Sequence, residues 1–184
     1  MAHAPVLSSE LSFEEYWALV ERGVLSEAKV ELIDGQVLSM SPQSREHELT
    51  TRQLMVLLGA VLPELKVQMP LRLPPSSAPE PDLALTRPLP ARSASDEARL
   101  AIEVVWSKWH EAMRKLPVYA GAGIGECWVV DIPKRLVHVH DQPSGREYLR
   151  TRTLAGSDVL EPPGTDLRFT VADVFASLDE PTDR

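Results

Sequence analysis

The sequence predicts a mixed α/β fold of the α+β kind, with a mixed β-sheet at its core and helices flanking the sheet. Two apolar runs, 100–105 and 126–131, are rich in β-branched residues and bounded by polar ones, which is typical of strands covered on both faces. The polar segment between them, 107–121, predicts a helix. An alternating run at 29–40 is interrupted by Asp34-Gly35, a strong signal for the two-residue turn of a β-hairpin.

The N-terminal half is expected to add two helices and a strand. Ser12 and Glu15 form a capping-box pattern at the start of a helix that ends near residue 22. A second helix is predicted over 44–62, where a dense apolar segment favours packing against the sheet. A strand should follow at 66–73.

Prolines dominate the next segment. Seven of them lie between residues 70 and 90, too many for regular structure. We therefore expect a loop that presents Asp82 at the start of a short strand. The polar residues 87–99 are interpreted as a connection within the same domain.

The C-terminal half predicts more strands than helices. The run 135–141 should pair with the second apolar run as a hairpin, a further strand is expected at 146–154, and a short helix near 171–178. His138 and His140 share one strand face. Because no third ligand is near, we interpret that face as exposed to solvent and not as a metal site.

Length and composition indicate one globular protein. At 184 residues, with 43% hydrophobic and 25% charged residues, we expect a single domain over 11–178 with flexible tails at 1–10 and 179–184. No apolar run reaches the roughly 18 residues of a membrane span, and the first residues lack the features of a secretion signal. These observations predict a cytoplasmic protein with no membrane partner. Cys127 lies inside an apolar run, which favours a buried thiol.

The formal net charge of −8 argues against a protein that mainly coats nucleic acid. It does not exclude a nuclease, because clefts that bind metal ions are themselves acidic.

Three residues on the central elements predict a site. Glu103 lies inside the first apolar run, where a carboxylate is unfavourable unless a partner offsets its charge. Asp82 opens another strand, and Lys115 lies between Glu111 and Tyr119 on one stripe of the intervening helix. Two acids from adjacent strands with a lysine are the composition of a site that holds a hard divalent cation and hydrolyses a phosphodiester. A buried ion pair without catalysis is the alternative.

The ordered set of motifs resembles a known family. The matching segments are 30–35, His47, Pro81-Asp82 and 101–131, and together they resemble the Uma2 family, also catalogued as DUF820. The resemblance implies the PD-(D/E)xK restriction-endonuclease-like fold. It also implies that Mg²⁺ or Mn²⁺ is the cofactor, held by the carboxylates of Asp82 and Glu103 and the carbonyl of Val104. The site residues carried over in this way are Asp82, Glu103, Lys115, Glu31, His47 and Tyr119.

Some positions depart from the family pattern. The lysine expected two residues after the acid is replaced by Val105, and the resemblance implies that Lys115 supplies this cation from the following helix. Trp106 stands where a serine is usual, Glu111 stands where an aspartate is common, and the stretch from Glu103 to Lys115 is shorter than usual. Trp106 and Trp109 are expected to pack in the core or an interface; the alternative is that one of them stacks on a base.

Two functions follow from these observations. The first is a divalent-metal-dependent endonuclease that hydrolyses phosphodiester bonds in nucleic acid, with DNA as the expected substrate. The second is a catalytically inactive module of the same fold that binds protein or nucleic acid. A homodimer is expected in either case. A small-molecule hydrolase is set aside, because the sequence has no nucleophile elbow or Cys-His framework.

Overall fold

The structure is a computed structural model that describes residues 10–25, 29–40, 42–87 and 96–179. The predicted tails, 1–10 and 179–184, lie almost wholly outside the described residues. Among the helices that are described, none is both long enough and apolar enough to cross a membrane.

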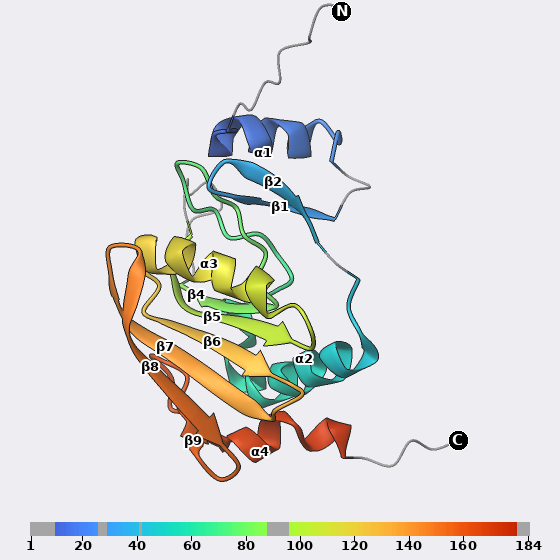
Figure 1. Cartoon of the computed structure of the whole chain (residues 1–184), viewed down its shortest axis with the longest axis vertical. Helices are drawn as coiled ribbons and strands as arrows, with labels where there is room; N and C mark the ends of the chain where they lie inside the picture. Colours follow the sequence, from blue (N-terminus) through green and yellow to red (C-terminus); the bar gives the residue numbers. More distant parts are fainter. Residues whose placement is uncertain (1–9, 26–28, 41, 88–95, 180–184) are drawn as a thin grey trace, which may run out of the picture.

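A six-stranded mixed sheet forms the body of the protein (Figure 1), which confirms the predicted fold class. The helix α3 (Trp109–Gly121) connects the third strand in spatial order to the fourth. These two strands run parallel, whereas the other neighbouring pairs of the sheet are antiparallel. In spatial order the strands are β3 (Leu65–Val67), β4 (Leu83–Thr86), β5 (Ala98–Val105), β6 (Glu126–Asp131), β7 (Leu136–Ser144) and β8 (Glu147–Ala155).

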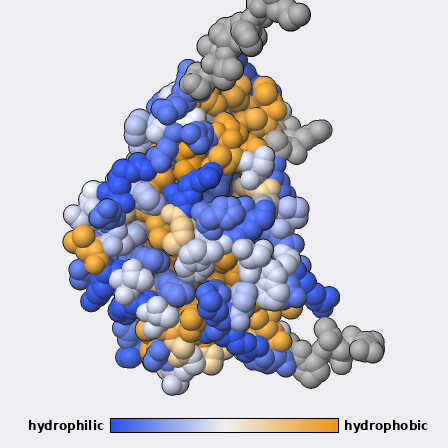
Figure 2. Space-filling view, viewed as in Figure 1, coloured by the Kyte–Doolittle hydropathy of each residue, from blue (hydrophilic) through white to orange (hydrophobic). Residues whose placement is uncertain are grey.

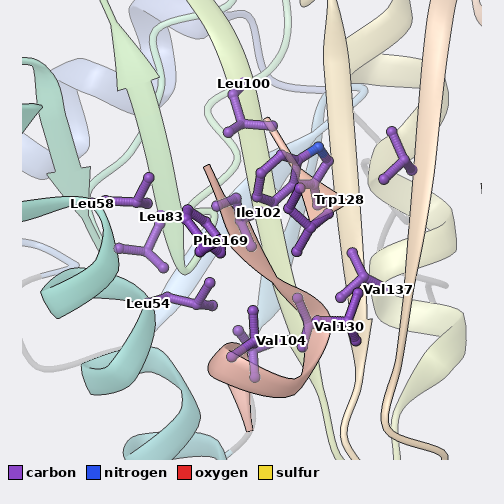
Figure 3. Packing of buried hydrophobic residues seen from close by; sticks show 14 of the residues in the cluster. Leu54, Leu58, Leu83, Leu100, Ile102, Val104, Trp128, Val130, Val137 and Phe169 are labelled. Atoms are coloured by element: carbon purple, nitrogen blue, oxygen red, sulfur yellow. The ribbon is translucent and has the colours of Figure 1, made fainter. Parts of the chain in front are cut away.

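The two faces of the sheet are covered by different helices. Along β5, Leu100, Ile102 and Val104 point to the face covered by α2 (Arg45–Leu57) and α4 (Val171–Val174). Figure 3 shows these side chains packed with Leu54, Leu58, Trp128 and Phe169. The alternate residues of β5 face α3. A strand buried on both faces therefore explains the continuous apolar run, and Glu103 is the exception on the α3 face.

A smaller N-terminal unit lies beside this body. It consists of α1 (Phe13–Glu21) and a separate hairpin of β1 (Val30–Ile33) and β2 (Gln36–Ser39), drawn in blue in Figure 1. The predicted capping box of Ser12 and Glu15 is present. Asp34 and Gly35 have φ values of 48° and 77°, as the predicted tight turn requires. Figure 2 shows hydrophobic residues gathered on the surface over this part of the molecule.

Backbone hydrogen bonds join the N-terminal unit to the loop that precedes β4. Ala78 N–H donates to the carbonyl of Leu32 at 2.8 Å, and Gly35 N–H donates to that of Ser76 at 2.7 Å. The proline-rich segment is therefore a loop, as predicted, and it lies between the hairpin and the sheet.

Two predicted elements are shorter than expected. The strand predicted at 66–73 ends at Val67, because Gln68 adopts a left-handed φ of 47° and Pro70 follows. The helix predicted over 44–62 is an α-helix only to Leu57. Its last part is the 3₁₀-helix η1 (Gly59–Glu64), which contains Pro63.

The C-terminal predictions hold with two corrections. The short helix appears as α4 and the 3₁₀-helix η2 (Ala176–Leu178), but the small sheet of β9 (Val159–Leu160) and β10 (Phe169–Thr170) was not predicted. The face of His138 and His140 is not open to solvent. Both are half-buried, and the Trp109 ring packs edge-on against His138 at 5.0 Å.

Candidate active site

The site lies at the end of β5, where the strand leaves the sheet and leads into α3. A cavity of about 150 Å³ opens there between β1, the start of α2, the segment before β4, and α3. One water needs only about 10–15 Å³ of space measured in this way. The cavity, called the site cavity below, is therefore large enough for an ion with part of its water shell.

A buried lysine connects two glutamates at the base of the site cavity. Lys115 Nζ lies 3.1 Å from Glu103 Oε2 and 3.0 Å from Glu31 Oε2, and it donates to the carbonyl of Glu80 at 3.0 Å. Lys115 is 5% exposed and Glu103 is 6% exposed. The hydroxyl of Tyr119, one turn further along α3, donates to Glu103 Oε1 at 2.5 Å.

Asp82 forms the other half of the site. His47 Nε2 lies 3.0 Å from Asp82 Oδ1, and the N–H of Val104 donates to Asp82 Oδ2 at 2.8 Å. The Ser44 hydroxyl accepts a hydrogen bond from the His47 N–H and caps α2, which fixes the turn that carries the imidazole. The Thr51 hydroxyl lies 3.4 Å from Nδ1 of the same ring.

Strand register explains why the two acids meet. Leu83 pairs with Ile102 in the antiparallel ladder of β4 and β5. One step further, Asp82 stands opposite Glu103, so both side chains project toward α3.

The ladder between β4 and β5 ends at Leu83 and Ile102, one step before Asp82. Beyond that point the N–H of Val104 donates to the Asp82 carboxylate. Pro81, the residue before Asp82, has no N–H to donate. The side chain of Asp82 thus takes the place of a backbone partner at this end of β5.

The environment shifts the pKa values of these groups. Burial raises the pKa of Glu103 to about 7, and the negative charge of Asp82 adds to this, against the opposing effects of Lys115 and the Tyr119 hydroxyl. Burial alone would lower the pKa of Lys115, but the carboxylates of Glu103 and Glu31 outweigh it and raise that pKa. The ammonium group thus stays charged, while Glu103 titrates near neutral pH.

Glu80 is a site residue that the sequence did not reveal. Its carboxyl lines the site cavity, and burial together with the charge of Glu31 raises its pKa. Gln43 was also missed; its side-chain amide lies 3.5 Å from Asp82 Oδ1. The one available signal was that Glu80 directly precedes Pro81-Asp82.

All six predicted side chains, with Val104, meet at this one place. Glu31, for which the strand pattern left two orientations, points into the site cavity and not to water. Val105 lies on the same face as Glu103 but is buried in the apolar cluster under α3, and the cation comes from Lys115.

The two tryptophans differ from each other. Trp109 packs against His138, in agreement with the packing prediction. Trp106 does not pack in the core: it is 44% exposed at the rim of the site cavity, because the chain turns away from the sheet directly after β5.

The donor set can be tested against a divalent ion. Within the described residues, no three His, Cys, Asp or Glu side chains converge as a complete ligand group. Asp82 and Glu103 offer carboxylate oxygens, and the Val104 carbonyl offers a third. Mg²⁺ and Mn²⁺ prefer hard oxygen donors, and Mg²⁺ keeps several waters when bound by one or two carboxylates. The residues therefore fit such an ion, with water completing its shell.

Comparison with known proteins gives two matches. A family model described as "Uma2: Putative restriction endonuclease" matches residues 13–172. Among solved structures, the chain is similar to a crystal structure from Anabaena variabilis ATCC 29413 described as "a putative nuclease belonging to DUF820". The TM-score is 0.73 at 14% sequence identity, over 91% of this chain and 99% of that chain, so this similarity shows the fold alone. No curated protein matches the chain.

Proposed function

The chain belongs to the Uma2 family, and from this premise we propose that it is a divalent-metal-dependent endonuclease that hydrolyses phosphodiester bonds in DNA. The observation that carries the proposal is the meeting of Asp82 and Glu103 at the site cavity, where Lys115 contacts Glu103. Carboxylate and carbonyl oxygens at the end of a sheet are donors suited to Mg²⁺ or Mn²⁺. A bound ion of this kind supplies Lewis-acid polarisation of a phosphate and a water of lowered pKa.

The chain's own residues divide the remaining work. Lys115 holds a positive charge beside Glu103, where it can orient a water and stabilise negative charge on a phosphate oxygen. Tyr119 fixes the rotamer of Glu103 through its hydrogen bond. Glu31 holds Lys115 from the opposite side.

His47 and Asp82 form a second contact of the site. His47 Nε2 lies 3.0 Å from Asp82 Oδ1, and the residue lines the site cavity. A histidine placed in this way is suited to orient the carboxylate of Asp82.

Metal binding gives the first test, because it needs no knowledge of the substrate. We expect isothermal titration calorimetry of the chelator-treated protein to show one Mn²⁺ site, and Asp82→Asn and Glu103→Gln to lose it. Asp141→Asn is the matched control, since Asp141 is also a buried carboxylate but lies on β7, bound to Arg150.

Cleavage of plasmid DNA in Mg²⁺ or Mn²⁺ gives the second test. Activity that both site variants abolish and the control retains would support the proposal. Wild-type protein that binds no Mn²⁺, or site variants that bind it as well as wild type, would contradict the proposal and favour a noncatalytic interaction module. The predicted homodimer remains a prediction, and sedimentation equilibrium would test it.

A further inference from the structure

A second cavity lies directly beside the site cavity. We call it the hairpin pocket; it has a volume of about 130 Å³ and opens between the β1–β2 hairpin and α3. Ile33, Leu38 and Ser39 line it from the hairpin, and His110 and Arg114 line it from α3. Glu31, Glu111 and Lys115 line both cavities, so one layer of side chains separates them.

The charge of Arg114 is available to a ligand. Most arginines in the described part of the chain contact a carboxylate, as Arg99 contacts Glu64 and Arg146 contacts Asp34. Arg114 is exposed and forms no ion pair or hydrogen bond with any described residue. This is unusual in a chain with 27 acidic and 19 basic residues, and it leaves a guanidinium free at the edge of the proposed site.

The two acids that line the pocket beside Arg114 each contact a lysine, and Glu31 shares its lysine with Glu103. Glu31 contacts Lys115 at 3.0 Å, and Glu111 contacts Lys108 at 3.3 Å. His110, one turn before Arg114 on the same stripe of α3, is exposed at the same pocket. The hairpin pocket therefore presents a guanidinium, an imidazole and the Ser39 hydroxyl over an apolar floor of Ile33 and Leu38.

We infer that the hairpin pocket is a backbone subsite that binds the DNA phosphate next to the one cleaved. An arginine with nearby hydroxyl and imidazole donors is a phosphate-binding set, and an apolar floor suits a deoxyribose ring. The inference rests on the proposed function, since the site cavity defines which phosphate is cleaved. It assigns Arg114 to substrate binding.

Fluorescence anisotropy with a short labelled DNA duplex tests this directly. The assay uses the full chain with Ca²⁺ in place of Mg²⁺, because Ca²⁺ also takes oxygen ligands, and gel analysis verifies that the duplex stays intact. We expect Arg114→Gln to weaken binding about tenfold and to lower the salt-dependence slope by about one. Arg114→Lys should keep most of the slope, since it keeps the charge.

Arg22→Gln is the matched control. Arg22 is an exposed arginine that follows α1, and its side chain forms no hydrogen bond or ion pair with any described residue. Its variant should bind DNA like wild type. The inference is overturned if Arg114→Gln and Arg22→Gln behave alike, if the loss is the same at every salt concentration, or if wild-type protein does not bind the duplex.

Failure of the subsite can be separated from failure of the nuclease. If Arg114→Gln cleaves DNA with the KM of wild type, the subsite is wrong and the nuclease stands. If no Mn²⁺ binds and no DNA is cleaved, the nuclease is wrong, whatever Arg114 does to DNA binding.

Discussion

Two buried carboxylates of one sheet, Glu103 on β5 and Asp141 on β7, have opposite surroundings. Asp141 is 4% exposed and Glu103 is 6% exposed. Both guanidinium groups of Arg150 and Arg152 donate to Asp141, at distances from 2.7 to 3.3 Å, and their hydrogen bonds lower its pKa. Glu103 shares the single ammonium of Lys115 with Glu31 and also lies near Asp82, and its pKa is raised.

Burial of an acid therefore does not by itself mark a functional site. Arg150 and Arg152 face two acids, Asp141 and Glu126, so the local charge is balanced there. One cation between two carboxylates leaves negative charge in excess, and a divalent ion is the kind of partner that would neutralise it. The pKa directions of the two acids therefore distinguish a structural ion pair from a candidate site.

The largest expected difference is in catalysis. Glu103→Gln removes a charged donor oxygen from the proposed ion site and should lower DNA cleavage about 1000-fold. Asp141→Asn lies outside the site and should change the rate by less than about threefold. Initial rates on plasmid DNA, with folding verified by circular dichroism, measure both. Equal losses of cleavage in the two variants would show that Glu103 has no special role in the reaction.

A large effect on stability is expected from Lys115→Met. The substitution leaves Glu31 and Glu103 buried without their shared cation and should lower the free energy of unfolding at pH 8 by about 3 kcal/mol. Asp141→Asn should cost about 1 kcal/mol, because Arg150 and Arg152 are half exposed and can be hydrated. Urea titrations compare them. A Lys115 variant as stable as the Asp141 variant would show that the shared cation does not hold the site together.

Glu103 and Asp141 should also make the free energy of unfolding depend on pH in opposite directions. Glu103 has an ordinary pKa of 4.5 and a folded pKa of about 7, so the folded state favours its proton. Its contribution is full below about pH 4.5 and is lost as the pH rises to about 7, a change of about 3 kcal/mol. Asp141 behaves in reverse: its contribution is present above its ordinary value of 3.8 and is lost as the pH falls below it.

Unfolding measured from pH 3 to 8 tests these signs. Glu103→Gln should remove the decline between pH 4.5 and 7, and Asp141→Asn should reduce the loss in acid. If Glu103→Gln leaves that decline unchanged, Glu103 is not the group that titrates there.

The smallest expected effect comes from single hydroxyl groups. Tyr119→Phe removes the hydrogen bond that favours ionised Glu103, so it should raise the pKa of Glu103 further and lower stability by about 1 kcal/mol. NMR of the Glu103 carboxyl carbon follows the titration. Tyr148→Phe is the matched control, because the Tyr148 hydroxyl donates to the carbonyl of Ile124 and should leave Glu103 unchanged.

The sequence predicted the body of the fold because its signals are local. The β-branched runs became β5 and β6, and the capping box of Ser12 became the start of α1. The end of β3 and the small strands β9 and β10 were not predictable in the same way. Strands of two or three residues carry no periodicity, and their existence depends on a partner far along the chain.

The candidate site was predicted unevenly for the same reason. Asp82, Glu103 and Lys115 stand out from their own segments, whereas Glu31, His47 and Tyr119 were identified only by resemblance to a family. The orientation of Glu31 depends on how the hairpin docks on the loop near Ala78, a contact more than 40 residues away in sequence. Glu80 is held through its own backbone, whose N–H donates to Glu31 and whose carbonyl accepts from Lys115.

The separate β1–β2 hairpin gives the site a further property. The hairpin belongs to a different sheet from β5, yet it supplies Glu31 to Lys115. Segments that pair outside the main sheet can open as a cooperative unit of their own, with a lower free energy than global unfolding. Each such opening would withdraw Glu31 and leave the Lys115 ammonium to Glu103, which would couple the charge of the site to a local folding equilibrium. Amide hydrogen exchange in Leu32 and Ile33 would therefore report on the same event that changes the charge around Glu103.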